Sequence, residues 1–325
     1  MNWRKAEVYA VVHKDEDIRA MSRSGGVFTA LSDKVLETGG VIYGCVLNKD
    51  FQAVHIRATE KETRNLMCGS KYIQSKMGET YKDIEADLVT DKLVLFSGTS
   101  CQVAGLKGFL GKEYDNLLCV DIVCFGVPSP LVWKKYLEWQ ESKAGAKVIF
   151  ANFRNKKEFG WRSHVETLML DNGRQINSKV FAKIFSSRVA LRPCCYKCPY
   201  KSTIHPGDIT IADYWGIEKV LPDFDDNKGV SLVLVNNARG DKVFESIKPH
   251  IMWQPTQIEN AMQPALIEPF NEPHERMCFW RDFHSANFYK IAKKYGGFGI
   301  RNEVAKKLRT IKRYAKIILN NVGVY

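Results

Sequence analysis

The cysteines near position 195 are the residues of this chain whose type and spacing best fit a chemical role. Residues 191–199 read Leu-Arg-Pro-Cys-Cys-Tyr-Lys-Cys-Pro, so Cys195 and Cys198 form a Cys-x-x-Cys pair followed by proline. Such pairs bind soft metal ions and iron–sulfur clusters through their thiolates. The pair supplies two ligands, and a closed four-thiolate site requires two more from the other seven cysteines.

The composition also favours metal or redox chemistry. The chain has 325 residues, of which 45% are hydrophobic, enough for a sizeable core in one or two domains. It has no apolar run near the roughly 18 residues of a membrane helix and no signal peptide, so we expect a soluble, cytoplasmic protein. Nine cysteines, an odd number, then point away from disulfides. We interpret four of them as small buried hydrophobic residues: Cys45, Cys68, Cys119 and Cys278.

The apolar pattern of the first 140 residues predicts strands that alternate with helices. Strands are expected at 8–12, 41–47, 53–58, 93–96 and 117–123, with residues 48–50 closing a hairpin. Helices are expected from Val27 with Ser24 as N-cap, from about Cys101 after a turn at 97–100, and over 131–140. This order is typical of an α/β fold with a mixed, largely parallel sheet and flanking helices.

Two further cysteines follow predicted strands and complete a four-thiolate set. Cys101 comes after strand 93–96 and Cys124 directly after strand 117–123. If these strands are parallel neighbours, both thiols emerge at the carboxyl edge of one sheet, where open α/β sheets build ligand sites. Cys101 also begins a helix, which favours its thiolate.

The residues alone do not decide which metal is bound, nor which of two adjacent cysteines is one of its ligands. Four thiolates suit zinc as well as an iron–sulfur cluster, although structural zinc sites usually draw on two close pairs. Cys194 is an alternative to Cys195 as ligand.

The second half of the sequence is less regular. Strands are expected at 148–154, 164–170 and 208–215, with a turn at 171–173, whereas residues 216–280 are proline-rich and predicted to be loop-rich. Residues 281–325 carry eleven Lys and Arg against two acidic residues, +9 of the net +12, and predict a basic C-terminal helix. This tail either docks an acidic protein, a nucleic acid or an anionic membrane surface, or it is a solvated helix face.

The ordered set of motifs resembles the coenzyme F420 hydrogenase/dehydrogenase beta-subunit family over roughly residues 6–240. The motifs include Ser24-Gly-Gly-Val-Phe28, Gly69-Ser-Lys-Tyr-Ile-Gln-Ser75, Phe96 to Leu106, Val120 to Cys124, Gly126 to Pro130, Phe153-Arg154, Gly160-Trp161, Leu191 to Cys198 and Asp208 to Gly216.

The resemblance implies a subunit with FAD and one [4Fe–4S] cluster, whose cysteine positions are Cys101, Cys124, Cys195 and Cys198. The segments that it implies for the flavin contain Ser24, Gly25, Gly26, Tyr72, Gln74, Ser75, Thr99 and Gln102. It also implies a division into residues 1–87 (flavin-binding part), 88–250 (cluster cysteines) and 251–325 (loop-rich segment and basic tail).

The sequence departs from the family pattern at several positions. Phe125 stands where relatives usually have His, Ser100 where Pro is usual, and Cys194 where Ser is usual, so we favour Cys195 as ligand. Many relatives begin with a ferredoxin-like domain; here we expect it to be absent or on another polypeptide.

The main hypothesis is an oxidoreductase that passes electrons between a ferredoxin-type partner and a two-electron carrier such as coenzyme F420. Other oxidoreductase subunits are candidate partners, and nucleic acid is disfavoured.

One alternative is a four-cysteine zinc protein whose basic tail binds nucleic acid or an acidic partner; another is a non-catalytic electron-transfer subunit. Arg154, Lys156 and Trp161 either line the pocket of the second substrate or are exposed loop residues with no ligand role. We expect no Ser/His/Asp constellation and assign no histidine a function.

Overall fold

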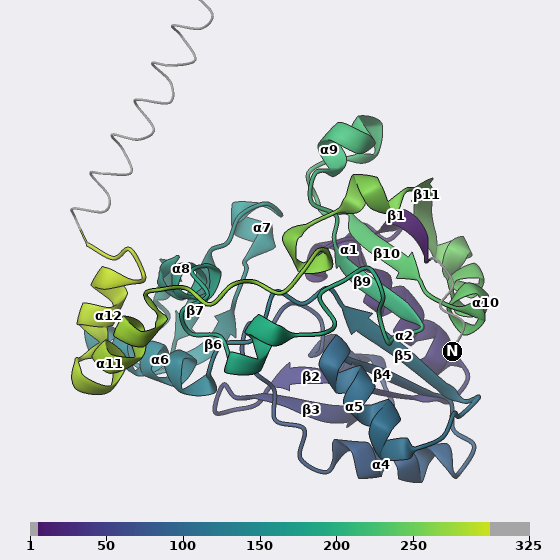
Figure 1. The fold of residues 1–325 in the computed structure, drawn as a ribbon, viewed down its shortest axis with the longest axis horizontal. Helices are drawn as coiled ribbons and strands as arrows, with labels where there is room; N and C mark the ends of the chain where they lie inside the picture. Colours follow the sequence, from purple (N-terminus) through teal and green to yellow (C-terminus); the bar gives the residue numbers. More distant parts are fainter. Residues whose placement is uncertain (1–5, 300–325) are drawn as a thin grey trace, which may run out of the picture.

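The computed structural model describes residues 6–299, and its centre is an eight-stranded mixed sheet (Figure 1). The strand order is β11-β1-β10-β9-β5-β4-β2-β3. Within the described chain, five of the eight strands (β1, β2, β4, β5 and β9) run in one direction, and β3, β10 and β11 run against them. The bounds are β1 (Glu7–His13), β2 (Val41–Leu47), β3 (Ala53–Ala58), β4 (Val94–Thr99), β5 (Leu117–Ile122), β9 (Ile209–Asp213), β10 (Ser231–Val235) and β11 (Ile251–Thr256).

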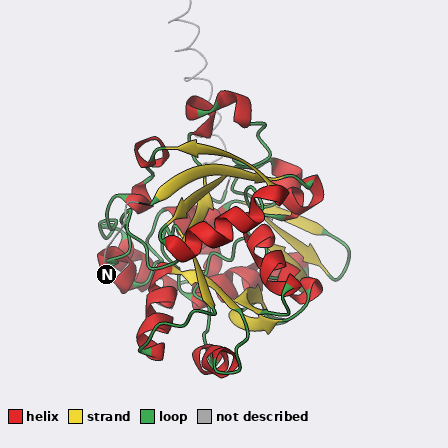
Figure 2. Cartoon of the chain, turned by 90° about the vertical axis from the view of Figure 1, so that its right-hand side faces the viewer, coloured by secondary structure: helices red, strands yellow, loops and turns green. Residues whose placement is uncertain are grey.

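Helices cover both faces of this sheet, as the turned view shows (Figure 2). On one face, α2 (Val27–Glu37) and α10 (Ala238–Ile247) pack over β1, β2 and β10. On the other face, α4 (Thr80–Leu88) and α5 (Ser100–Leu110) pack over β2, β4 and β5. The strands therefore need apolar side chains on both faces, which explains the continuous apolar runs in the sequence. Shorter helices are α1 (Glu16–Met21), α3 (Lys61–Asn65), α7 (Lys156–Phe159) and α9 (Ile217–Val220).

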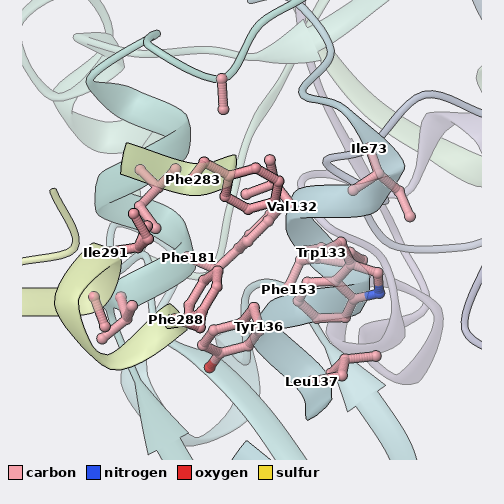
Figure 3. Packing of buried hydrophobic residues seen from close by; sticks show 14 of the residues in the cluster. Ile73, Val132, Trp133, Tyr136, Leu137, Phe153, Phe181, Phe283, Phe288 and Ile291 are labelled. Atoms are coloured by element: carbon pink, nitrogen blue, oxygen red, sulfur yellow. The ribbon is translucent and has the colours of Figure 1, made fainter. Parts of the chain in front are cut away.

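A smaller antiparallel sheet and four helices form a second layered unit beside the large sheet. The sheet consists of β6 (Val148–Asn152), β7 (Glu166–Leu170) and β8 (Gln175–Ser178). Its helices are α6 (Pro130–Ala144), α8 (Val180–Ser186), α11 (Arg276–Ser285) and α12 (Phe288–Lys294). Their aromatic side chains, among them Trp133, Phe181 and Phe283, pack into one core (Figure 3). Trp133 also donates its indole N–H to the Phe51 carbonyl oxygen at 3.1 Å, which joins α6 to the β2–β3 hairpin.

The α/β class and the parallel pairing of the strands that precede the lone cysteines are confirmed. β4 and β5 are parallel neighbours, as predicted, and their register places Thr99 opposite Ile122. The β2–β3 hairpin has the predicted bounds.

Two local expectations were wrong, and a third was incomplete. Residues 97–100 are not a turn, because β4 continues to Thr99 and α5 begins at Ser100. Ser24 does not cap α2: the N-cap is Gly26 at φ 92°, and the Ser24 hydroxyl donates to the Val230 carbonyl oxygen at 2.7 Å instead. Residues 216–280 contain loops and short 3₁₀ helices, as expected, but also β10, α10 and β11, for which no element was predicted.

The three predicted segments all contribute strands to the large sheet, and the boundaries at residues 87 and 250 stay predictions. Most of the predicted basic helix lies outside the described residues. Within residues 6–299, none of the helices has the length and apolarity needed to cross a membrane.

Candidate functional site

Cys101 and Cys124 lie at the carboxyl edge of the large sheet, where β4 and β5 end side by side. The chain passes from β4 into α5 without a loop because Thr99 serves as N-cap, in a reciprocal capping box with Gln102. Cys101 therefore lies in the first turn of α5, and its sulfur is 3.1 Å from the Thr99 hydroxyl oxygen.

The Cys195 segment is held against the backbone that follows Cys124. The Arg192 amide donates to the Val127 carbonyl oxygen at 3.0 Å, and the Ser129 amide donates to the Ala190 carbonyl oxygen at 3.1 Å. Gly126 has φ 126°, and a Cβ there would lie 2.8 Å from a Leu191 methyl group and 3.4 Å from the Cys195 Cβ. Glycine at position 126 thus allows the two cysteine-bearing segments to touch. Cys195 lies within a short 3₁₀ helix, η1 (Pro193–Lys197), and Cys198 follows its last residue.

The four predicted ligands share one electrostatic environment. Burial raises the pKa of Cys124 to about 12, and thiolate charge on Cys101, Cys195 and Cys198 raises it as well, whereas the Gly126 amide lowers it. Burial likewise raises the pKa of Cys195, which the Val127 amide partly offsets. Each thiolate disfavours ionisation of its neighbours, and a bound metal ion or cluster would compensate this repulsion.

The thiols do not converge on one point, however. Among the residues that the structure describes, no three His, Cys, Asp or Glu side chains are grouped as a single metal ion would require. A tetrahedral zinc ion draws four sulfurs to about 2.3 Å from one centre. An iron–sulfur cluster takes each thiolate on a different iron, so its ligands are spread more widely. Four thiolates are donors that a cluster accepts, and the assignment of these cysteines to a cluster stays a prediction.

Cys194 is also close to this group but differs from Cys195 in its surroundings. It is exposed, whereas Cys195 is buried and receives the Val127 amide. Cys194 contributes to raising the pKa of both Cys101 and Cys195.

Five of the predicted flavin residues lie next to the cysteines. Gln102 donates to the Ser75 hydroxyl oxygen at 2.8 Å. Gln74 accepts a hydrogen bond from the Arg192 guanidinium in the segment that carries Cys195. The Tyr72 ring stacks on Phe185 with 4.8 Å between centroids, and Phe185 in turn contacts Phe125. Tyr72, Gln74, Ser75, Thr99 and Gln102 are therefore brought together around α5 and the cysteines.

The Ser24-Gly25-Gly26 turn lies against β1 and β10. A Cβ on Gly25 would lie 2.1 Å from the Val11 carbonyl oxygen, and one on Gly26 would lie 2.9 Å from the His13 Cβ. Packing inside the protein therefore accounts for both glycines. A phosphate-binding role for this turn stays a prediction.

Arg154 and Trp161 belong to a buried charged cluster, not to exposed loops. Arg154 contacts Asp213 at 2.7 Å and also donates to the Tyr72 hydroxyl oxygen at 3.2 Å. Trp161 donates its indole N–H to Asp213 at 3.0 Å and stacks on Trp215. Burial lowers the pKa of Lys156 to about 8, and its ammonium donates to the Ser24 carbonyl oxygen at 3.2 Å. This cluster connects the Ser24 turn with the Tyr72 segment.

Sequence reasoning missed two members of this edge of the sheet. Arg23, whose guanidinium is 3.9 Å from Asp213, joins the charged cluster. His205 lies with its Nδ1 3.0 Å from Asp121 and 3.2 Å from the Ser100 hydroxyl oxygen, so Ser, His and Asp side chains do meet, contrary to expectation. Both contacts involve the same ring nitrogen, so the imidazole cannot relay a proton between these partners. No local motif marks either residue, because each acquires its neighbours only through the fold.

Comparison with known proteins agrees with the fold and the motifs. The family model for the carboxyl-terminal part of the coenzyme F420 hydrogenase/dehydrogenase beta subunit matches residues 91–260, more than half of the chain. The chain therefore belongs to this family of redox proteins. A search of curated proteins gave no match.

A solved structure shares the fold. A chain of the F420-reducing [NiFe] hydrogenase complex from Methanosarcina barkeri is 17% identical, with a TM-score of 0.54, and the match covers 78% of this chain and 83% of that chain. At this level of identity the likeness shows the fold alone.

Proposed function

We propose that this protein is a flavin and iron–sulfur oxidoreductase. Its Cys101, Cys124, Cys195 and Cys198 would hold one [4Fe–4S] cluster, and the residues around α5 would hold FAD. A ferredoxin-type protein is the proposed electron donor, other oxidoreductase subunits are candidate partners, and a two-electron organic carrier such as coenzyme F420 is the proposed acceptor. The observation that carries the proposal is the packing of the Cys195 segment on the backbone that follows Cys124, at the sheet edge where Cys101 also lies.

The two groups would supply complementary chemistry when bound, because a cluster carries single electrons and a flavin exchanges either one electron or a hydride. Two reduced ferredoxin-type donors would each give one electron. These two electrons and one proton from solvent make up the one hydride equivalent that the carrier receives. The protein's own residues position the groups and exclude water. Phe125, Phe185 and Tyr72 form an aromatic contact series beside the cysteines.

The neighbourhood of the cysteines supports a flavin there. Ser75, Thr99 and Gln102 form one hydrogen-bonded unit, so the Tyr72–Ser75 segment and the first turn of α5 keep a fixed relation to Cys101. Arg154 and Arg23 provide two positive charges near Tyr72, and both pair with the single carboxylate of Asp213. Such charge suits an anionic cofactor or carrier.

The test is anaerobic reduction of the purified protein by chemically reduced ferredoxin. We expect the visible flavin band to bleach and the electrons to pass on to added F420. The Cys124→Ser variant should fail in the first step, because the cluster site lacks a ligand. If reduced ferredoxin leaves a bound flavin oxidised, the proposed electron path is wrong.

A further inference from the structure

Lys201 is a buried lysine beside the cysteines. It lies three residues after Cys198, and only 4% of its surface is exposed. Its ammonium donates to the Phe125 carbonyl oxygen at 3.0 Å and lies 3.6 Å from the centre of the Phe270 ring. Within residues 6–299, no Asp or Glu forms an ion pair with it.

A buried ammonium is costly unless a negative charge compensates it. The carbonyl oxygen and the Phe270 ring face offer only partial charges. The groups close to Lys201 that can carry full negative charge are three of the four predicted ligands. Burial lowers the pKa of Lys201, and thiolate charge on Cys124, Cys195 and Cys198 works against that effect.

We propose that Lys201 is the fixed counter-cation of the thiolate-bound cluster and raises its reduction potential. This inference rests on the proposed function. One-electron reduction adds one negative charge to a [4Fe–4S] cluster, and a fixed positive charge stabilises the reduced state more than the oxidised one. The Lys201 ammonium is withdrawn from solvent, and salt screens buried charges only weakly. Its charge would therefore act strongly on a cluster bound by these cysteines.

The same residue also fixes backbone geometry next to a ligand. Phe125, whose carbonyl oxygen accepts the Lys201 hydrogen bond, lies between Cys124 and Gly126. The Gly126 amide is the donor that lowers the pKa of Cys124. Lys201 is therefore a positioning residue that acts on the cluster through charge and through this backbone turn.

Lys197 provides a matched control. It is even closer to Cys198 in sequence, but its side chain is exposed, so its charge is screened by water and salt. Removing either lysine lowers the net charge of the protein by one. A change in cluster potential that appears only in the Lys201 variants therefore comes from the position of Lys201 and not from net charge.

The experiment measures the midpoint potential of the cluster by redox titration followed by electron paramagnetic resonance, on anaerobically purified protein. Lys201→Met is the main neutral variant, because its unbranched apolar chain suits the buried position, and Lys201→Gln is the second. Both should lower the midpoint potential, whereas Lys201→Arg and Lys197→Gln should stay near the wild type. Iron content and circular dichroism are recorded for each variant.

The outcomes separate this inference from the proposed function. An unchanged potential in the neutral variants, with the cluster intact, would overturn the role of Lys201. Loss of the cluster in folded neutral variants, but not in Lys201→Arg, would support the role of Lys201, since the positive charge is then needed to keep the cluster bound. Loss of cluster in the arginine variant as well would show that shape and not charge matters, and would also overturn it. A wild-type protein without iron would refute the proposed function itself.

Discussion

At the scale of single residues, the choice between two adjacent cysteines defines the site. Sequence reasoning favoured Cys195 only from the family pattern. The structure supplies a physical reason, because Cys195 is buried and receives the Val127 amide while Cys194 is exposed. Amide donors to sulfur are one of the means by which proteins stabilise thiolates and tune clusters.

We predict that Cys195→Ser loses most of its iron and its visible cluster absorbance, whereas Cys194→Ser keeps both. A serine at 195 removes a ligand, and a serine at 194 changes only an exposed side chain. Iron assay and absorbance spectra of the two variants, purified in parallel without oxygen, provide the measurement. Equal iron in both, or loss from Cys194→Ser alone, would reassign the ligand.

Residues that act through long-range contacts could not be predicted. Lys201, Arg23 and His205 sit in ordinary local sequence, and their neighbours come from strands and loops far along the chain. The strand-end cysteines could be predicted because their positions follow from one simple rule, that parallel strands end at a common edge.

At the scale of elements, strands with a strong apolar pattern were predicted correctly, whereas a strand in a proline-rich region was missed. The β2–β3 hairpin and the parallel pair β4–β5 were both predicted from their apolar residues. Prolines on either side of β10 favoured a loop, although Ser231–Val235 is fully buried in the middle of the sheet. The short apolar run at 231–235 is a strand because the sheet buries it on both faces. Only the fold shows this burial, so the sequence did not predict it.

Asp87 joins α4 to two strands, and it should make this junction sensitive to acid. It receives hydrogen bonds from Arg57 at 2.6 Å, Tyr43 at 2.7 Å and Lys92 at 2.8 Å. Burial by itself would raise the pKa of Asp87, but these bonds outweigh it and hold the pKa well below its ordinary value of 3.8. Its stabilising contribution is therefore complete above about pH 4 and is lost as the pH falls below that value.

We predict that Asp87→Asn lowers the free energy of unfolding at neutral pH and weakens its dependence on pH below about pH 4. Urea unfolding followed by circular dichroism across this pH range measures both effects. Asp83→Asn is the control, since Asp83 lies on the exposed side of the same helix. If Asp87→Asn and the wild type lose stability in parallel below pH 4, Asp87 is not the group responsible.

At the scale of the whole molecule, the segment beyond residue 251 is part of the folded body as far as residue 299. Helices α11 and α12 supply Phe283 and Phe288 to the core around α6 (Figure 3), and α11 also supplies Phe279. The predicted loop-rich character therefore applies to the stretch between β11 and α11, which contains only short 3₁₀ helices.

The strongly basic part of the tail, residues 301–325, carries a prediction about the partner. We expect its deletion to slow flavin reduction by ferredoxin at low salt and to have less effect at high salt, because charge attraction steers acidic partners. Stopped-flow reduction rates at several salt concentrations provide the measurement. Unchanged rates at low salt would exclude this docking role.

The central claim is that the four cysteines hold an iron–sulfur cluster beside a flavin, and cofactor analysis of anaerobically purified protein tests it most directly. Iron, acid-labile sulfide, zinc and flavin are measured on the same sample, together with its absorbance spectrum. We predict one [4Fe–4S] cluster, which is about four iron and four sulfide per chain, with bound FAD and no zinc. A colourless, zinc-loaded protein without flavin would contradict the claim.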